Sequence, residues 1–261
     1  MKLAEDVAAI VTGGASGLGA ATARALRAQH VKVALFDRNR EAVSALAKEI
    51  GAVPCVVDVT SEESVAQGFA KARAANGQER LLVNCAGIAP AARTVGRERE
   101  GGARTRHDMA LFEAAVAINL VGTFRCCTYA AQGMTTLPPL GADGARGVIV
   151  NTASITAEDG QIGQVAYAGS KGGVAAMTLP LARDLMADGI RVNTILPGIF
   201  ATPMVAGMPD AVQEALGAAV PFPKRLGQPE EYARLALFIA ENDYLNAATI
   251  RLDGAVRMGP K

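Results

Sequence analysis

Short runs of apolar, β-branched residues alternate with longer amphipathic segments along nearly the whole 261-residue chain. Continuous apolar runs of this length are typical of strands buried on both faces, and a 3.6-residue periodicity between them indicates helices. The alternation predicts a single doubly wound α/β domain over residues 1–261, with a parallel sheet of about seven strands and helices on both faces. The expected strands are Val7–Val11, Val31–Phe36, Val53–Val57, Leu81–Val83, Val148–Val150, Arg191–Ile195 and Thr249–Leu252. The expected helices lie near residues 17–29, 40–49, 61–76, 109–133, 165–188 and 228–240.

Composition and charge argue against a nucleic-acid-binding or membrane protein. Half of the residues are hydrophobic and the formal net charge is +1, so there is no global attraction to nucleic acid or to anionic membranes. No apolar run approaches the roughly 20 residues of a membrane span, and no cleavable signal peptide is visible. We therefore expect a soluble, cytoplasmic protein with neither nucleic-acid nor membrane partners.

The cysteines provide no metal or disulfide framework. Cys55, Cys85, Cys126 and Cys127 lack C-x-x-C spacing and form no cluster with histidine. Structural and catalytic zinc sites need such spacings, so we expect no metal and four buried, reduced thiols.

A glycine-rich turn follows the first expected strand and leads directly into a helix. The sequence TGGASGLG places Gly13, Gly17 and Gly19 in a G-x-x-x-G-x-G spacing, which differs from the common G-x-G-x-x-G fingerprint. Glycines allow close backbone approach, and a helix N-terminus offers free N–H groups to a pyrophosphate, as in Rossmann folds. On its own, the turn is equally well explained as a structural turn.

Two carboxylates strengthen the nucleotide interpretation. Asp37 ends the second expected strand, where it could accept hydrogen bonds from ribose hydroxyls, and Asp58 ends the third, near the expected adenine position. The alternative is that both only cap the helices that follow them. Asp37 would repel a 2′-phosphate, which favours NAD over NADP, while Arg38 and Arg40 keep NADP open.

A serine, a tyrosine and a lysine form the third constellation. Tyr167 and Lys171 are four residues apart, hence on one face of a helix, and Ser154 ends the strand GVIVNTAS. Each alone is better explained as an ordinary turn or surface residue. Together they make an acid–base site that needs no histidine, because a nearby ammonium lowers the pKa of a phenol. Tyr167 would exchange the proton of an alcohol or ketone, and Ser154 would hold the same oxygen, while hydride moves to or from a nicotinamide.

The full set of motifs resembles the short-chain dehydrogenase/reductase superfamily. The glycine turn, the NCAG run at 84–87, Asn119, Ser154, the Tyr167–Lys171 pair and the Pro197–Gly198 step appear in that order. The resemblance implies that Asn119 joins the three catalytic residues by holding a water that relays the proton. The N-N-A-G motif is usual there, so Cys85 is a departure. The resemblance implies these cofactor-binding residues: Thr12, Gly13, Ser16, Gly17, Leu18, Gly19, Asp37, Asp58, Val59, Asn84, Cys85, Ala86, Gly87, Tyr167, Lys171, Pro197, Gly198, Phe200 and Thr202.

A narrower resemblance is to the type II short-chain 3-hydroxyacyl-CoA dehydrogenases, which are also 17β-hydroxysteroid dehydrogenases. The segments GQIGQVAYAGSKGG, VPFPKRLGQPEEYA and IRLDGAVRM, with an inserted loop at 90–108, are similar to that branch. This implies a homotetramer that converts 3-hydroxyacyl-CoA to 3-oxoacyl-CoA with NAD in fatty acid metabolism. The alternatives are a broad secondary-alcohol, hydroxysteroid or ketone dehydrogenase that does not use CoA, and an NAD-bound, non-catalytic scaffold subunit.

Substrate contacts are expected from residues 155–165 and from a lid at 199–220. Besides Ser154 and Tyr167, Gln161 and Gln164 could hydrogen-bond a substrate carbonyl, although surface glutamines are an equal reading. The apolar residues proposed for the pocket are Ile155, Ile162, Met204 and Met208.

The inserted loop is rich in arginine. Arg93, Arg97, Arg99, Arg104 and Arg106 lie within it, partly offset by two glutamates. A solvated loop of mixed charge is one reading. The other is that Arg104 and Arg106 bind the phosphates of CoA, because guanidinium groups suit phosphate in charge and geometry.

Overall fold

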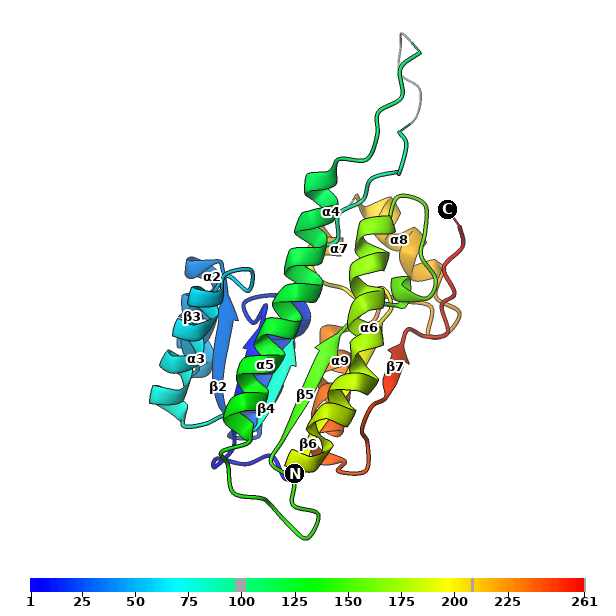
Figure 1. The fold of residues 1–261 in the computed structure, drawn as a ribbon. Helices are drawn as coiled ribbons and strands as arrows, with labels where there is room; N and C mark the ends of the chain where they lie inside the picture. The colour runs from blue at the N-terminus through cyan, green and yellow to red at the C-terminus, as the bar shows by residue number, and fades with distance from the viewer. Residues whose placement is uncertain (97–101, 208, 261) are drawn as a thin grey trace.

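The structure, a computed structural model, describes residues 1–96, 102–207 and 209–260. Arg97, Arg99 and Met208, as well as the side chain of Met204, lie outside the described part. The described residues form a parallel sheet in the order β3-β2-β1-β4-β5-β6-β7 (Figure 1). The strands are β1 (Ala8–Thr12), β2 (Lys32–Asp37), β3 (Val53–Val56), β4 (Leu81–Asn84), β5 (Gly147–Thr152), β6 (Ile190–Pro197) and β7 (Thr249–Leu252). The predicted doubly wound parallel sheet is confirmed.

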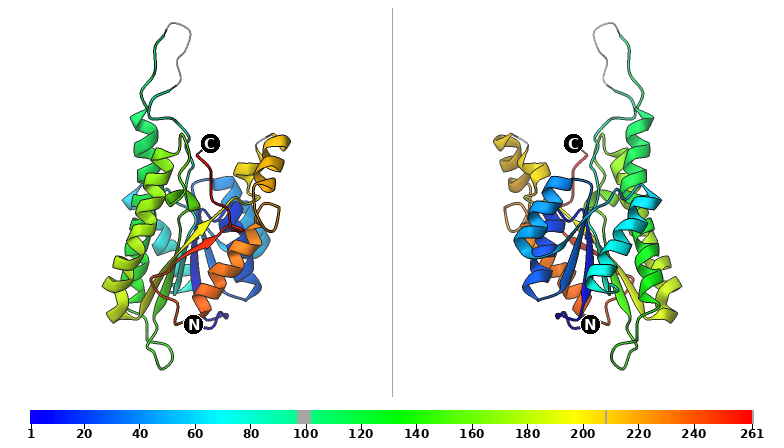
Figure 2. Two further views of the ribbon diagram at one scale, coloured as in Figure 1. Left: turned by 90° about the vertical axis from the view of Figure 1, so that its right-hand side faces the viewer. Right: turned by 90° about the vertical axis from the view of Figure 1, so that its left-hand side faces the viewer.

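Helices cover both faces of this sheet (Figure 2). One face carries α1 (Gly17–Ala28), α2 (Arg40–Ile50) and α9 (Pro229–Glu241), and the other carries α3 (Glu62–Asn76), α5 (Thr123–Met134) and α6 (Val165–Leu185). Side chains of β1 alternate between the two cores, with Val11 in one and Ile10 in the other. Burying such a side chain stabilises the fold by roughly 1.5–3 kcal/mol, so the register of each strand is strongly specified.

The order of the strands creates the ligand site. The chain leaves β1 toward β2 on one side and returns to β4 on the other, so the loops after these strands diverge. The resulting crevice at the carboxyl ends of β1 and β4 is where open α/β sheets bind ligands.

The long helical segment Met109–Met134 departs from one expectation. It comprises α4 (Met109–Ala115), the π-helix η1 (Val116–Gly122) and α5, and by length and composition its 26 residues could cross a membrane. The sequence pattern concealed this because Glu113 and Arg125 interrupt the apolar run. A core helix packed on a sheet meets the same criterion; this segment buries Cys126, Ala130 and Met134 against the sheet, although only 33% of its most apolar stretch is buried.

The inserted loop forms an arm that projects beyond α4 at the ligand end of the sheet (Figures 1 and 2). Its two sides pair as antiparallel backbone, with an isolated bridge between Val95 and Arg106. At its base, the backbone N–H of Ala92 donates a 2.8 Å hydrogen bond to the carbonyl of Gly163. The arm is therefore joined directly to the segment that precedes α6.

The segment 199–220, which we expected to form a lid, contains two short helices that the sequence pattern did not predict. These are α7 (Pro203–Ala206) and α8 (Asp210–Ala218). Two short 3-10 turns, η2 (Ile155–Ala157) and η3 (Met186–Asp188), also precede and follow α6.

Candidate active site

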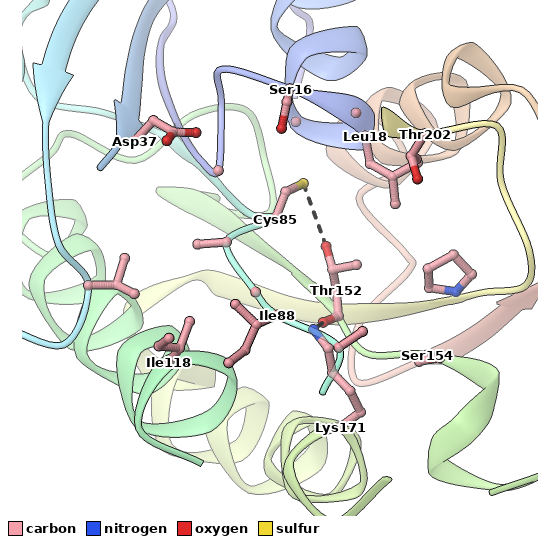
Figure 3. Close-up of a pocket in the computed structure, with 18 of the residues that line it drawn as sticks. Ser16, Leu18, Asp37, Cys85, Ile88, Ile118, Thr152, Ser154, Lys171 and Thr202 are labelled. Carbon is pink, nitrogen blue, oxygen red and sulfur yellow. Dashed lines mark hydrogen bonds between the residues drawn. The ribbon is translucent and has the colours of Figure 1, made fainter. Parts of the chain in front are cut away.

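A cavity of about 450 Å³ opens at the carboxyl edge of the sheet (Figure 3). Its volume lies in the range of small-molecule sites. Most of the predicted cofactor and catalytic residues line it: Gly13, Ser16, Gly17, Leu18, Gly19, Asp37, Asp58, Val59, Cys85, Ala86, Gly87, Ser154, Tyr167, Lys171, Pro197, Gly198, Phe200 and Thr202. The fold thus brings residues from the carboxyl ends of several strands, and Tyr167 and Lys171 from α6, to one site.

The glycine turn is shaped for close backbone approach. Gly13 has φ +60°, and a Cβ there would lie 2.8 Å from backbone atoms of Cys85 and Ala86. A Cβ on Gly19 would collide with the carbonyl of Gly13. Ser16 is the N-cap of α1, yet its side chain does not cap the helix. The hydroxyl and the first amides of α1 can therefore serve an anionic ligand.

Asp37 and Asp58 do not cap the helices that follow them. Asn39 caps α2 and Ser61 caps α3. Asp37 instead accepts hydrogen bonds from the backbone N–H groups of Ala15 and Asn39, at 3.1 and 3.0 Å. These contacts fix the Asp37 carboxylate beside the glycine turn, with both oxygens still able to accept further bonds.

Asp58 is held in a similar way at the end of the third strand. Its Oδ1 accepts hydrogen bonds from the Thr60 hydroxyl at 2.7 Å and the Thr60 N–H at 2.9 Å. These bonds lower the pKa of Asp58, with smaller contributions from Arg38 and Arg125. The group is therefore an acceptor at neutral pH.

Ser154, Tyr167 and Lys171 all line the cavity, the last two from successive turns of α6. Burial raises the pKa of the Tyr167 phenol, and a hydrogen bond with Ser154 partly opposes this. Lys171 Nζ donates a 2.7 Å hydrogen bond to the carbonyl of Thr152, and burial lowers the pKa of Lys171 to about 8. The predicted serine, tyrosine and lysine thus line one cavity, but burial raises the Tyr167 pKa instead of the ammonium lowering it, and their acid–base roles remain a prediction.

Asn119 lies within the π-helix η1 and is fully buried. Its Nδ2 donates to the Ile88 carbonyl and to Ser170 Oγ, both at 2.9 Å, and its Oδ1 accepts from the Ile88 N–H at 2.8 Å. A Cβ on Gly87 would lie 3.0 Å from Asn119 Oδ1 and 3.4 Å from Lys171 Nζ. Asn119 and Lys171 therefore both approach the backbone of Gly87 at the cavity wall. Single-turn π segments are frequent at functional sites. The proton-relay role remains a prediction.

Thr12 and Asn84 lie behind the described lining of the cavity. Thr12 Oγ1 accepts from the N–H groups of Cys85 and Ala86, each at 3.2 Å, and donates to Asn84 Oδ1 at 3.3 Å. Asn84 Nδ2 in turn donates to Asn151 Oδ1 at 2.9 Å. The geometry gives these residues a supporting role: they hold the backbone that forms the cavity wall.

Gln161 and Gln164 also lie outside the described lining. Gln161 Nε2 donates to the carbonyl of Gly259 at 3.0 Å, and Gln164 Oε1 accepts from the Gln161 N–H at 3.1 Å. Both side chains are thus bound within the loop or to the C-terminal segment. Their predicted contact with a substrate carbonyl finds no support in this arrangement.

Cys85 differs from the expectation of four buried thiols. It is half-buried and lines the cavity, whereas Cys55, Cys126 and Cys127 are buried; all four are free. Thr152 Oγ1 donates to Cys85 Sγ at 3.6 Å (Figure 3). It also shares a 2.6 Å hydrogen bond with the hydroxyl of Tyr232. Burial raises the pKa of the Cys85 thiol, so it is neutral at physiological pH.

Several lining residues were missed at the sequence level. Ile88 and Ile118 extend into the cavity, and Thr152 contributes both its backbone carbonyl and its hydroxyl to the site (Figure 3). Of these three residues, only Ile88 could have been predicted from the sequence, because it directly follows the NCAG run. Among the described residues, no group of three or more His, Cys, Asp or Glu could hold a metal ion.

Known proteins resemble this chain over its full length. A family model described as enoyl-(acyl carrier protein) reductase matches residues 13–256. The 3-hydroxyacyl-CoA dehydrogenase type-2 of Drosophila melanogaster is 47% identical over 258 residues, covering 98% of this chain and 99% of the fly protein. The human protein of the same name is 46% identical, covering 98% and 97%. The crystal structure of 3-hydroxyacyl-CoA dehydrogenase type-2 from Mycobacterium avium has a TM-score of 0.91 and 40% identity, with both chains covered completely. This chain belongs to the short-chain dehydrogenase/reductase superfamily and is an oxidoreductase acting on CH–OH groups.

Proposed function

We propose that the protein uses NAD to interconvert 3-hydroxyacyl-CoA and 3-oxoacyl-CoA. The observation that carries the proposal is one cavity holding Asp37 at one position and Ser154, Tyr167 and Lys171 at another. The first suits the ribose of a dinucleotide and the second suits proton exchange with a carbinol. The names of the fly, human and mycobacterial relatives favour the acyl-CoA substrate.

The residues present fit NAD. The glycine turn is a cradle that a single Cβ at Gly13 or Gly19 would obstruct, and the uncapped start of α1 suits a pyrophosphate. The Asp37 carboxylate would accept from ribose hydroxyls and repel the 2′-phosphate of NADP. Arg38 also lines the cavity, and its positive charge would attract the 2′-phosphate that Asp37 repels. The preference for NAD over NADP therefore depends on the balance between Asp37 and Arg38. When bound, an oxidised nicotinamide supplies the hydride acceptor.

The side chains provide the proton chemistry. In alcohol oxidation, Tyr167 as phenolate takes the hydroxyl proton of the substrate while the C–H bond of the carbinol carbon breaks. In ketone reduction, the Tyr167 hydroxyl returns that proton to the oxygen. Ser154 donates a hydrogen bond to the same oxygen and holds it in place. The positive charge of the Lys171 ammonium favours the phenolate form of Tyr167.

We also propose that the chain assembles as a homotetramer. Apolar side chains are exposed on the outer faces of the helices after the fourth and fifth strands, including Val121, Phe124 and Leu179, which are 42%, 44% and 44% exposed. Large apolar side chains left exposed on neighbouring helices favour association between copies. Light scattering after gel filtration tests this directly, and a monomer would exclude it.

The function is tested by following NADH on a panel of substrates. The panel contains 3-hydroxyacyl-CoAs, a hydroxysteroid and simple secondary alcohols, each with the parent protein and with Tyr167→Phe. Activity highest on the thioesters and lost in Tyr167→Phe supports the proposal. Equal activity on alcohols that lack CoA would favour a broad alcohol dehydrogenase instead. NAD binding without turnover on any substrate would favour a scaffold.

A further inference from the structure

The C-terminal segment lies across the loop that joins Ser154 to Tyr167 (Figure 1). The loop runs through residues 155–164, and the segment runs from the end of β7 to residue 260. The backbone N–H of Ile162 donates to the Pro260 carbonyl at 3.1 Å, and Gln161 Nε2 donates to the Gly259 carbonyl at 3.0 Å. Two elements about 100 residues apart in sequence are therefore bound to each other beside the cavity.

Arg251 is the principal link between them. Its guanidinium contacts Glu158 Oε2 and, at 2.6 Å, Asp159 Oδ2, both in the loop. It also contacts Asp253 Oδ2 at 2.8 Å and the Val256 carbonyl at 2.9 Å, both in the C-terminal segment. The side chains of Arg251 and Asp159 are each 17% exposed and that of Asp253 is 8% exposed, so these two contacts are better shielded from solvent and salt than a surface ion pair, whereas Glu158 is 49% exposed.

The contacts continue to the reacting groups. Met258 Sδ lies 4.0 Å from Thr156 Oγ1, and Val256 and Met258 pack with Ile155 in one apolar cluster. Thr156 holds Ser154 directly: Ser154 Oγ accepts from the Thr156 N–H and donates to Thr156 Oγ1, each at 3.1 Å. At the other end, the loop enters α6 two residues before Tyr167.

We propose that Arg251 is a positioning residue: by tying the C-terminal segment to the loop, it sets the relative placement of Ser154 and Tyr167. This rests on the function proposed above. Arg251 does not line the cavity, and acts through Glu158 and Asp159. Because small misplacements of reacting groups lower the rate strongly, its loss acts mainly on turnover, while the glycine turn and Asp37, which lie in other loops, still hold the dinucleotide.

The test compares Arg251→Met with two controls. Arg257→Met removes a neighbouring arginine that hydrogen-bonds Asp253 and the Val256 carbonyl and acts on the loop only through its charge near Asp159. Leu46→Ala lowers stability from α2, far from the loop in the fold. For each variant, kcat is measured with a short 3-oxoacyl-CoA, NADH affinity by fluorescence titration, and the unfolding temperature by calorimetry.

We expect Arg251→Met to lower kcat by at least ~10-fold with NADH affinity changed less than about twofold, and both controls to keep the parent kcat. The pair Glu158→Gln/Asp159→Asn removes the loop side of the same contacts and should reproduce the loss of kcat if Arg251→Met does not fold. A parent-like kcat in Arg251→Met, or an equal loss in Leu46→Ala, overturns the positioning role. Tyr167→Phe is assayed alongside: if it retains activity, the proposed function fails, whereas its inactivity with a fully active Arg251→Met refutes only this inference.

Discussion

Lys171 Nζ donates a 2.7 Å hydrogen bond to the backbone carbonyl of Thr152, the last residue of β5. The ammonium is therefore fixed by the sheet itself, while the helix that carries it also carries Tyr167 one turn earlier. Since Lys171 is 5% exposed and faces no acidic partner in the described contacts, burial lowers its pKa to about 8. Its charge is thus sensitive to pH just above neutrality.

The first prediction concerns the pH dependence of both directions. Below about pH 8, Lys171 is charged in the free enzyme and the Tyr167 phenol, whose pKa burial raises, is protonated. In ketone reduction Tyr167 gives this proton to the substrate and becomes a phenolate, which the Lys171 ammonium stabilises by charge, so kcat/KM should be high at neutral pH and fall as Lys171 loses its charge above about pH 8. Alcohol oxidation needs the phenolate and should rise with pH. Steady-state profiles in both directions measure this.

Lys171→Arg provides the matched variant, because arginine keeps its charge at every pH in that range. The ketone-reduction activity that remains in Lys171→Arg should no longer fall as the pH rises past about 8. If the activity of the variant still falls past this pH, Lys171 is not the group whose titration causes the fall.

The second prediction concerns the phenol. Tyr167→Phe keeps the ring and removes the group that exchanges the proton, so kcat should fall by at least ~10². NAD affinity should be retained, because the glycine turn and Asp37 are unchanged. Turnover is measured by NADH absorbance and affinity by calorimetric titration; near-normal turnover would refute the acid–base role.

The fold was largely predictable from the sequence because each strand is a short, continuous apolar run. Ile10 and Val11 both read as core residues, and each is in fact buried, on opposite faces. The pattern could not reveal α7 and α8, which are too short for a clear helical period. It also missed that η1 is a π-helix, because the residues Val116–Gly122 continue the α-helical pattern around them.

The site was predictable where a residue type implies chemistry, and less so where tertiary contacts decide the role. Asp37 and Asp58 line the cavity as expected, and only the structure shows that Asn39 and Ser61 cap the helices instead. Gln161 has the chemistry of a substrate contact, but it binds the Gly259 carbonyl, 98 residues away in the chain. No local pattern encodes such a distant partner.

The third prediction concerns the choice of cofactor. Asp37 is held by two backbone N–H groups beside the glycine turn, where a 2′-phosphate of NADP would approach it. Asp37→Ser removes the negative charge but keeps a hydrogen-bonding group, and Arg38 remains beside it. The ratio of kcat/KM for NAD to that for NADP should therefore be high in the parent and fall in the variant. A parent that uses NADP equally well would show that Arg38 outweighs Asp37.

The last prediction concerns CoA recognition by the arm. Arg104 and Arg106 are exposed on its returning side, which leads into α4, and the base of the arm is bonded to Gly163. Phosphates of a thioester lie far from its reacting carbon, so a projecting arm at the ligand edge suits them. We expect Arg104→Ala/Arg106→Ala to raise KM for a 3-hydroxyacyl-CoA, with each contact worth roughly 0.5–1 kcal/mol. The effect should shrink at high salt because exposed charge pairs are screened. The control is KM for a short secondary alcohol that lacks CoA, which should not change. An equal change for both substrates, or none for the thioester, would remove the arm from CoA recognition and favour a dehydrogenase with broad alcohol use.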